Sequence, residues 1–138
     1  MRLEVTRKSD LAVRALRSLA DETGRMKGPA LAAAVGSTSG FVSQVVNPLI
    51  RHGWVRSDPG PAGGYSLAVD LSSVSVLDVI EAIEGPTDSG RCVLADRRCD
   101  ERETCALHVP WLRAQGELLR ELDATSVAEA PLVSEVAE

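Results

Sequence analysis

The chain has 138 residues, a length that suits one compact domain with an appended helix, and 44% of them are apolar. It contains no run of about eighteen apolar residues, which excludes a membrane span, and its N-terminus lacks the apolar core of a signal peptide. We therefore expect a cytoplasmic protein. The net charge is −5, yet residues 1–60 carry nine basic and five acidic side chains, whereas residues 61–138 carry six and fifteen. This asymmetry fits a DNA-binding head on an acidic body, and it fits an unevenly charged surface equally well.

Two helices are predicted in the first quarter of the chain. Apolar residues at helical spacing indicate a first helix over residues 7–21, with Ser9 or Asp10 as its expected N-cap. Pro29 suits the first turn of a short second helix, since its missing N–H costs nothing there. Gly36 is the expected end of that helix.

A third helix is predicted over residues 41–52, after a polar turn at residues 37–40, with Pro48 expected to kink it or loosen its last turn. A short helix, a tight turn and a third helix with a polar outer face describe a helix-turn-helix, whose second helix enters the major groove of DNA. The candidate DNA contacts on this helix and the turn before it are Ser39, Ser43, Gln44, Asn47 and Arg51. The alternative is a three-helix packing unit that does not bind DNA.

The next segment predicts a β-hairpin. Residues 54–56 and 65–67 are short strand candidates, and the loop between them is rich in turn residues. A hairpin directly after a recognition helix is typical of a wing, which lies along the minor groove or the backbone of DNA. We expect Gly63 and Gly64 to allow a close approach to DNA here. The hairpin could instead only cover the edge of the core.

Two more helices are predicted beyond the hairpin. In the first, within residues 70–84, Ser75 and Asp78 form a start signal and an apolar stripe packs on the head. The second begins at His108 and carries a broad apolar face made of Trp111, Leu112, Gln115, Leu118, Leu119 and Leu122. Because one subunit is too small to bury this face, we expect a homodimer.

All three cysteines lie between these two helices. Cys92, Cys99 and Cys105 are separated by six and five residues, and His108 follows two residues later. An odd number of crowded cysteines is a poor disulfide framework and more often serves metal or redox chemistry. Thiolates bind soft metals and iron–sulfur clusters, and an imidazole can complete the site. Structural zinc sites usually use cysteine pairs two to four residues apart, so zinc is the second reading.

The whole pattern resembles the IscR/NsrR family of bacterial winged-helix regulators. The resemblance rests on the opening Met-Arg-Leu, the Gly63-Gly64-Tyr65 of the wing, Asp78-Val79-Ile80 in the fourth helix and, above all, the three cysteines. The spacing of Cys105, His108 and Trp111 looks like the IscR version. That version implies a 2Fe–2S cluster held by three cysteines and a histidine, in a homodimer whose C-terminal helices cross.

Two features depart from the family or compete with this ligand set. The family's wing usually carries an arginine before its glycines, and this chain has Pro59 there. The resemblance therefore implies a minor-groove contact that is either weaker or supplied by Arg56. In the NsrR branch, an aspartate from the first helix of the partner subunit completes a 4Fe–4S cluster, and Asp10 aligns with it. The fourth ligand therefore stays open between His108 and Asp10, and the cluster between 2Fe–2S, which we favour, and 4Fe–4S.

The predicted fold class is mainly α with a small β-hairpin: a winged helix-turn-helix head over residues 1–84, a cluster loop over 85–107, and a dimerisation helix with a tail over 108–138. The predicted function is a transcriptional regulator whose affinity for a double-stranded operator responds to the cluster. The alternatives are a structural zinc site and a cluster-free thiol switch. We expect neither an enzyme nor a small-molecule substrate, because the sequence has no phosphate loop, nucleophile elbow or acid–base pair.

Overall fold

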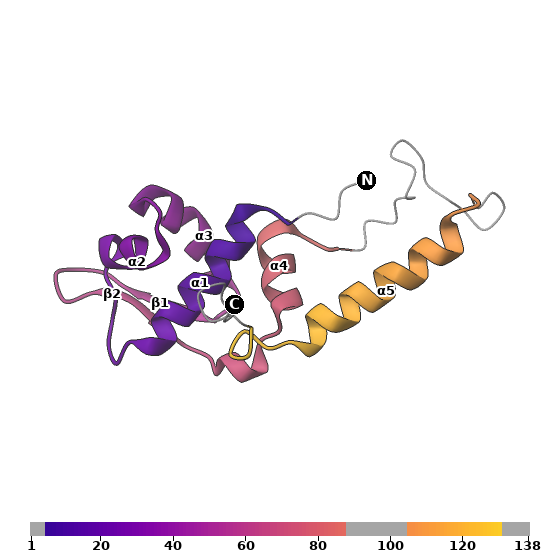
Figure 1. Cartoon of the computed structure of the whole chain (residues 1–138). Helices are drawn as coiled ribbons and strands as arrows, with labels where there is room; N and C mark the ends of the chain where they lie inside the picture. The colour runs from indigo at the N-terminus through magenta and orange to yellow at the C-terminus, as the bar shows by residue number, and fades with distance from the viewer. Residues whose placement is uncertain (1–4, 88–104, 131–138) are drawn as a thin grey trace, which may run out of the picture.

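The computed structural model describes residues 5–87 and 105–130. Its elements, in chain order, are α1 (Arg7–Asp21), α2 (Gly28–Val35), α3 (Ser39–Arg51), β1 (Val55–Asp58), β2 (Gly64–Leu67), the 3-10 turn η1 (Leu71–Ser73), α4 (Val76–Glu84) and α5 (His108–Ala124). In Figure 1, α1 to α4 and the hairpin form a head from which α5 projects. This arrangement confirms the predicted fold class, mainly helical with one two-stranded hairpin.

The core of the head forms around α1, which packs against α2, α3 and α4. One face of α1 supplies five buried apolar residues, namely Leu11, Ala12, Ala15, Leu16 and Leu19. The predicted helix over residues 7–21 is confirmed, but its predicted cap is wrong. The N-cap residue is Thr6, whose side chain makes no capping hydrogen bond. Ser9 lies inside the helix and is buried, and the Asp10 carboxylate pairs with Arg14.

The α2–α3 unit has the geometry of a helix-turn-helix. Gly36, in the left-handed conformation with φ of 70°, ends α2 as predicted. Thr38 then caps α3 by accepting the Phe41 N–H at 3.2 Å, so α3 begins two residues earlier than predicted. The helix continues beyond Pro48 to Arg51. Among the described helices none alone is long and apolar enough to cross a membrane, and only α2 and α3 together, bent by 97°, pass such a test.

The hairpin and α4 follow the predicted local signals. The strands β1 and β2 are antiparallel, with Val55 opposite Leu67 and Asp58 opposite Gly64. Ser75 and Asp78 form the predicted capping box at the start of α4: the Ser75 hydroxyl accepts the Asp78 N–H at 2.9 Å, and the Asp78 carboxylate accepts the Ser75 N–H at 3.0 Å. Local pairs of this kind fix an element without help from distant residues.

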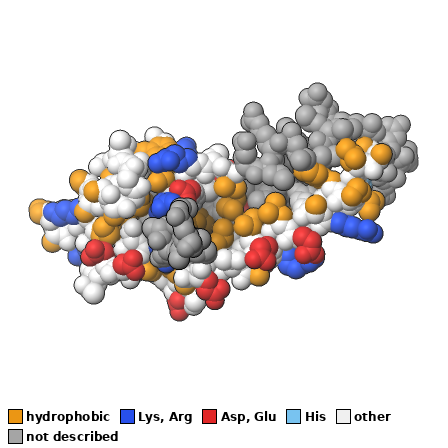
Figure 2. Space-filling view, viewed as in Figure 1, with side chains coloured by type: hydrophobic (Ala, Val, Ile, Leu, Met, Phe, Trp, Pro, Cys, Tyr) orange, Lys and Arg blue, Asp and Glu red, His pale blue; other side chains and the backbone are white. Residues whose placement is uncertain are grey.

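The last helix differs from the others because none of its residues is buried. Leu112 and Leu118 are 51% and 44% exposed, and Figure 2 shows hydrophobic side chains along α5. Beyond its C-terminal end the chain returns to the head. There the Val76 N–H donates to the Thr125 carbonyl at 2.9 Å, and the Val127 side chain is fully buried in the core. The helix is thus anchored at one end, and part of its apolar face, including Leu112 and Leu118, stays exposed.

Candidate nucleic-acid interface and cluster ligands

The helix α3 separates its apolar and polar residues onto two faces. Its buried side chains are Val42, Val45, Val46 and Leu49. The five residues of α3 that are predicted to contact DNA are all exposed, namely Ser39, Ser43, Gln44, Asn47 and Arg51. At helical spacing these five occupy one side of the helix, so the structure presents them together on an open surface. This is the arrangement that a recognition helix needs to reach base edges.

Contacts within the chain explain why glycine occupies both positions 63 and 64 of the wing. Gly63 is buried, and a Cβ atom there would lie 2.0 Å from the Asp58 carbonyl oxygen. Gly64 has a φ of 143°, and a Cβ atom there would lie 2.7 Å from the Met26 carbonyl oxygen. Both glycines are therefore required to close the hairpin and to let the turn before α2 approach it. A contact of either glycine with DNA stays a prediction.

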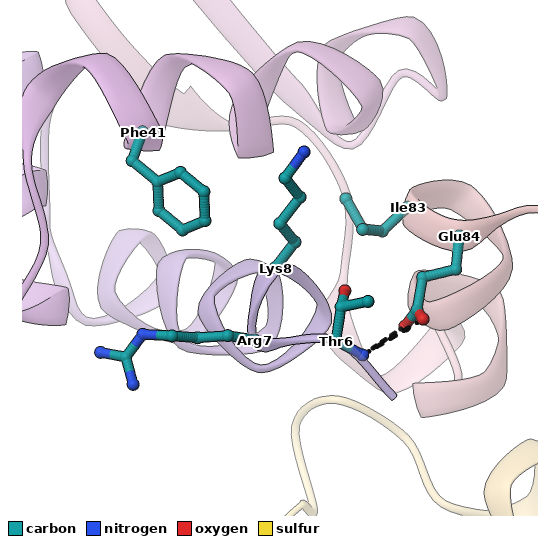
Figure 3. A pocket seen from close by; sticks show the side chains of 6 residues that line it. All are labelled: Thr6, Arg7, Lys8, Phe41, Ile83 and Glu84. Atoms are coloured by element: carbon teal, nitrogen blue, oxygen red, sulfur yellow. Dashed lines mark hydrogen bonds between the residues drawn. The ribbon is translucent and has the colours of Figure 1, made fainter. Parts of the chain in front are cut away.

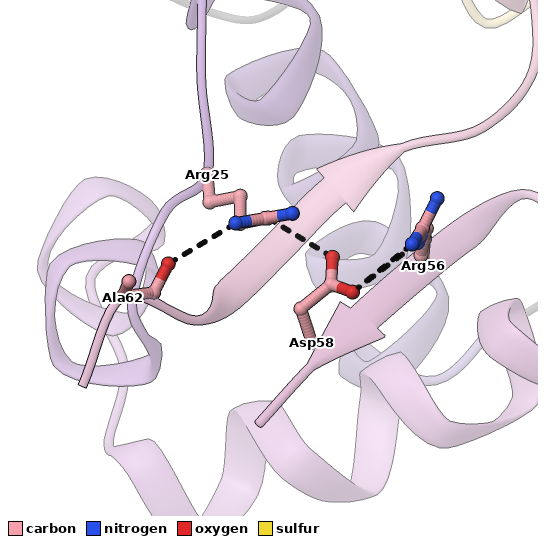
Figure 4. Close-up of polar contacts among 4 residues, drawn as sticks. All are labelled: Arg25, Arg56, Asp58 and Ala62. Atoms are coloured by element: carbon pink, nitrogen blue, oxygen red, sulfur yellow. Dashed lines mark hydrogen bonds and ion pairs between the residues drawn. The ribbon is translucent and has the colours of Figure 1, made fainter. Parts of the chain in front are cut away.

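Three charged side chains meet at the hairpin, as Figure 4 shows. The Arg25 Nε–H donates to Asp58 Oδ2 at 3.0 Å, and its Nη1 donates to the Ala62 carbonyl at 3.2 Å. The Arg56 Nε–H donates to the other oxygen of the same carboxylate at 3.3 Å. Arg56 is exposed, as its predicted role requires. Arg25 was not expected here, because it lies 33 residues before Asp58 in a turn without periodicity.

Two of the four predicted cluster ligands lie on the first turn of α5 or directly before it. The His108 N–H donates to the Cys105 carbonyl at 3.2 Å, and both residues are partly exposed. Cys92 and Cys99 lie outside the described residues. Iron–sulfur clusters accept thiolate and imidazole ligands. Because the side chains of Cys105 and His108 are not enclosed in the core, this pair of donors suits a cluster. Within the described ranges, no group of three His, Cys, Asp or Glu side chains is placed to hold a metal.

The rival ligand Asp10 is exposed on α1, where its carboxylate accepts the Arg14 Nε–H at 3.0 Å. Figure 1 shows the N-terminal end of α5 well away from α1. One chain therefore does not bring Asp10 to Cys105 and His108. A ligand role for Asp10 would require the partner subunit, as the resemblance implies.

A cavity of about 530 Å³ opens where α1 begins and α4 ends. Figure 3 shows the Lys8 side chain between Phe41 and Ile83, with the Glu84 carboxylate at the Thr6 backbone. The Thr6 N–H donates to the two Glu84 oxygens at 3.1 and 3.2 Å. No local pattern in the sequence predicts this contact, since it joins residues 78 positions apart.

A helix-turn-helix with an exposed polar face, followed by a hairpin, defines a winged-helix DNA-binding protein. Comparison with known proteins makes the class more specific. The sequence profile of the Rrf2 family, described as iron-dependent transcriptional regulators, matches residues 5–130. The transcriptional regulator IscR of Klebsiella pneumoniae is 32% identical over 111 residues, which cover 79% of this chain and 68% of that protein.

Solved structures agree with the fold. The global cysteine regulator CymR of B. subtilis matches with a TM-score of 0.75 at 24% identity, over 93% of this chain and 95% of CymR. IscR of T. potens matches with a TM-score of 0.72 at 24% identity, over 92% of this chain and 85% of that one. The chain belongs to the Rrf2 family of DNA-binding transcriptional regulators, which are not enzymes. This membership confirms the resemblance found in the sequence.

Proposed function

We propose that this regulator is a cytoplasmic homodimer whose affinity for a double-stranded operator depends on an iron–sulfur cluster. Cys92, Cys99 and Cys105 are the proposed thiolate ligands, and His108 is the preferred fourth ligand over Asp10 of the partner subunit. A bound cluster would supply a reversible response to redox state, nitric oxide or iron–sulfur supply. The proposed parts remain a DNA-binding head over residues 1–84, a cluster loop over 85–107 and a dimerisation segment over 108–138.

The observation that carries this proposal is the position of Cys105 and His108 at one end of α5, while the other end of the same helix is fixed in the head. Val127 has no exposed surface, and its N–H donates to the Val74 carbonyl at 2.8 Å. A change of ligation at Cys105 would therefore act on an element that is continuous with the core of the DNA-binding head. Such a switch requires that the two conformations bind the cluster with unequal affinity.

Spectroscopy of anaerobically purified protein tests the cofactor and its fourth ligand. Optical and Mössbauer spectra of the wild type should show a 2Fe–2S cluster, and His108→Ala should change them while Asp10→Ala should not. His52→Ala and Asp21→Ala are matched controls, because both residues are exposed and neither is a proposed ligand. A cluster that changes in Asp10→Ala but not in His108→Ala would reverse the ligand assignment.

DNA binding tests the regulatory part of the proposal. Operator sequences selected by the protein from a random pool would be titrated with cluster-loaded protein and with cluster-free protein, at one salt concentration because affinity depends steeply on salt. We expect the two forms to differ in affinity for the selected operator. Equal affinity would refute control by the cluster and leave the DNA-binding function in place.

A thiol switch without a cluster is the second candidate function. The solved structures similar to this chain include an oxidized form of Staphylococcus aureus CymR, at 24% identity and a TM-score of 0.72. In this reading, two of the three cysteines would form a disulfide on oxidation. Colourless anaerobic protein that gains a disulfide with peroxide would favour the switch, and colourless protein with stoichiometric zinc would favour a structural metal.

A further inference from the structure

Arg25 is fixed against the wing although it lies in the turn between α1 and α2. The next residue, Met26, exchanges two backbone hydrogen bonds with Tyr65 of β2, at 2.8 and 2.7 Å. The missing side chain of Gly64 makes room for this approach. The turn thus lies beside β2 like a third strand, and the Arg25 side chain starts from a backbone position that the wing itself determines.

Two guanidinium groups share the single carboxylate of Asp58. Arg25 donates to one carboxylate oxygen at 3.0 Å, and Arg56 donates to the other at 3.3 Å. The Asp58 side chain is only 20% exposed, whereas Arg25 and Arg56 are 46% and 69% exposed. One negative charge cannot neutralise two positive ones, so the outer surface of this group keeps a net positive charge.

Both arginines retain donors for another partner. Arg25 uses its Nε and Nη1 groups, and Arg56 uses Nε and Nη2, toward Asp58 and Ala62. A guanidinium has five N–H donors, and the others have no acceptor among the described residues. Lys27 adds a further positive charge, since it lines a cavity of about 240 Å³ together with Asp58.

The hairpin that carries this surface packs directly against α3, the candidate recognition helix. Guanidinium groups match the geometry of phosphate oxygens and bind them through paired N–H donors. We propose that Arg25, held against the wing beside Arg56, binds a phosphate group of the DNA backbone. The inference rests on the proposed DNA-binding function of the head and adds to it a residue from outside both the helix-turn-helix and the hairpin.

The alternative is that Arg25 only attaches the turn to the wing. An exposed ion pair contributes little to stability, so this attachment would be a modest structural gain. In that case, replacing Arg25 would not change the salt dependence of DNA binding. If Arg25 binds a phosphate, its loss makes the plot of log affinity against log salt concentration shallower by about 0.9.

The test measures this slope by fluorescence anisotropy, with the full chain and a labelled duplex of random sequence of about 30 base pairs, between about 50 and 200 mM salt. We expect Arg25→Gln to make the slope shallower by about 0.9 and Arg25→Lys to keep it near the wild-type value. Arg120→Gln is the matched control, because it removes the same charge from an exposed ion pair on α5 and should not change the slope.

A folded Arg25→Gln protein with the wild-type slope would overturn the inference while leaving DNA binding intact. Wild-type protein that binds neither this duplex nor any operator selected from the random pool would overturn the proposed function as well. A second measurement needs no variant: phenylglyoxal modification of the wild type, read by mass spectrometry, should be blocked at Arg25 by the bound duplex. Arg120 should stay reactive, and an Arg25 that is equally reactive with and without DNA would contradict the contact.

Discussion

The carboxylate of Glu84, the last residue of α4, caps the N-terminus of α1 by accepting the Thr6 N–H. It also accepts the hydroxyl of Ser9, a buried residue of the first turn. The start of α1 has no capping side chain of its own, so a residue from another helix satisfies its exposed backbone donor. A negative charge at this position also interacts favourably with the helix dipole. The two helices are therefore joined at the point where the chain leaves α4 toward the predicted cluster loop.

Removing this cap should destabilise the head. We expect Glu84→Ala to lower the free energy of unfolding by about 1–2 kcal/mol, because the Thr6 donor and the buried Ser9 hydroxyl both lose their acceptor. Urea denaturation followed by circular dichroism, at one protein concentration, measures the change. Glu81→Ala, one turn earlier and exposed, should change stability by less than about 0.5 kcal/mol. Equal losses in the two variants would show that Glu84 has no capping role.

Replacing glycine with alanine should change the stability of the protein in opposite directions at two positions. Gly64→Ala should lower the free energy of unfolding by about 2 kcal/mol, since the added Cβ would lie 2.7 Å from the Met26 carbonyl oxygen in a backbone conformation that alanine rarely adopts. Gly40→Ala should raise the free energy of unfolding by about 0.5 kcal/mol, because this position is helical and open. Thermal denaturation of the two variants beside the wild type checks both signs, and a stabilised Gly64→Ala would contradict the wing geometry.

The uncovered face of α5 predicts that Leu118 supports self-association rather than the fold of one chain. Leu118 is 44% exposed in a helix without buried residues. If a symmetric dimer buries it twice, Leu118→Ser should weaken association at least about tenfold, since burying one leucine contributes about 1.5–3 kcal/mol. Sedimentation velocity over a range of concentrations measures this constant. Arg113→Ser, on the same helix and exposed, is the control, and unchanged association in Leu118→Ser would place the interface elsewhere.

Stability should depend on pH through Asp70. The backbone N–H of Ser72 and then its hydroxyl, which donate to this carboxylate at 2.9 and 2.7 Å, lower the pKa of Asp70 below its ordinary value. A carboxyl whose pKa is lower in the folded state contributes stability that is present above the unfolded pKa and is lost as the pH falls through the folded one. The difference in unfolding free energy between wild type and Asp70→Asn should therefore shrink on acidification. A difference that grows as the pH falls would contradict this assignment.

Local signals in the sequence predicted most of the head. Gly36 and the Ser75–Asp78 capping box act within a few residues of the ends they define, and those ends lie where they were expected. The contacts that were missed join distant segments: Glu84 with Thr6, and Arg25 with Asp58. Ser9 was assigned to the wrong role for the same reason, because only the position of α4 reveals that its hydroxyl points into the protein. Spacing alone carries no information of this kind.

The candidate site also contains residues that local patterns predict and residues that only the three-dimensional structure reveals. The exposed polar face of α3 followed from its helical period, and the structure presents all five predicted residues on it. Arg25 could not be found from periodicity, since it lies in a turn and reaches the wing only through the Met26–Tyr65 backbone pairing. For the proposed cluster, Cys105 and His108 lie together at the start of α5. The assignment of all the candidate ligands, Asp10 included, stays a prediction.

The turn after α5 has a mechanical consequence. Residues 125–130 are held in the head through Val127 and Ala130, so a rotation of α5 relative to the head would have its pivot near the C-terminal end of the helix. Its 17 residues place His108 about 25 Å from that pivot, at 1.5 Å per residue. A rotation of about 5° at the pivot would then move the far end by about 2 Å, which follows from the length of the helix alone. A small rotation at the anchored end would therefore move His108 further, and a movement imposed at His108 would reach the head reduced in amplitude.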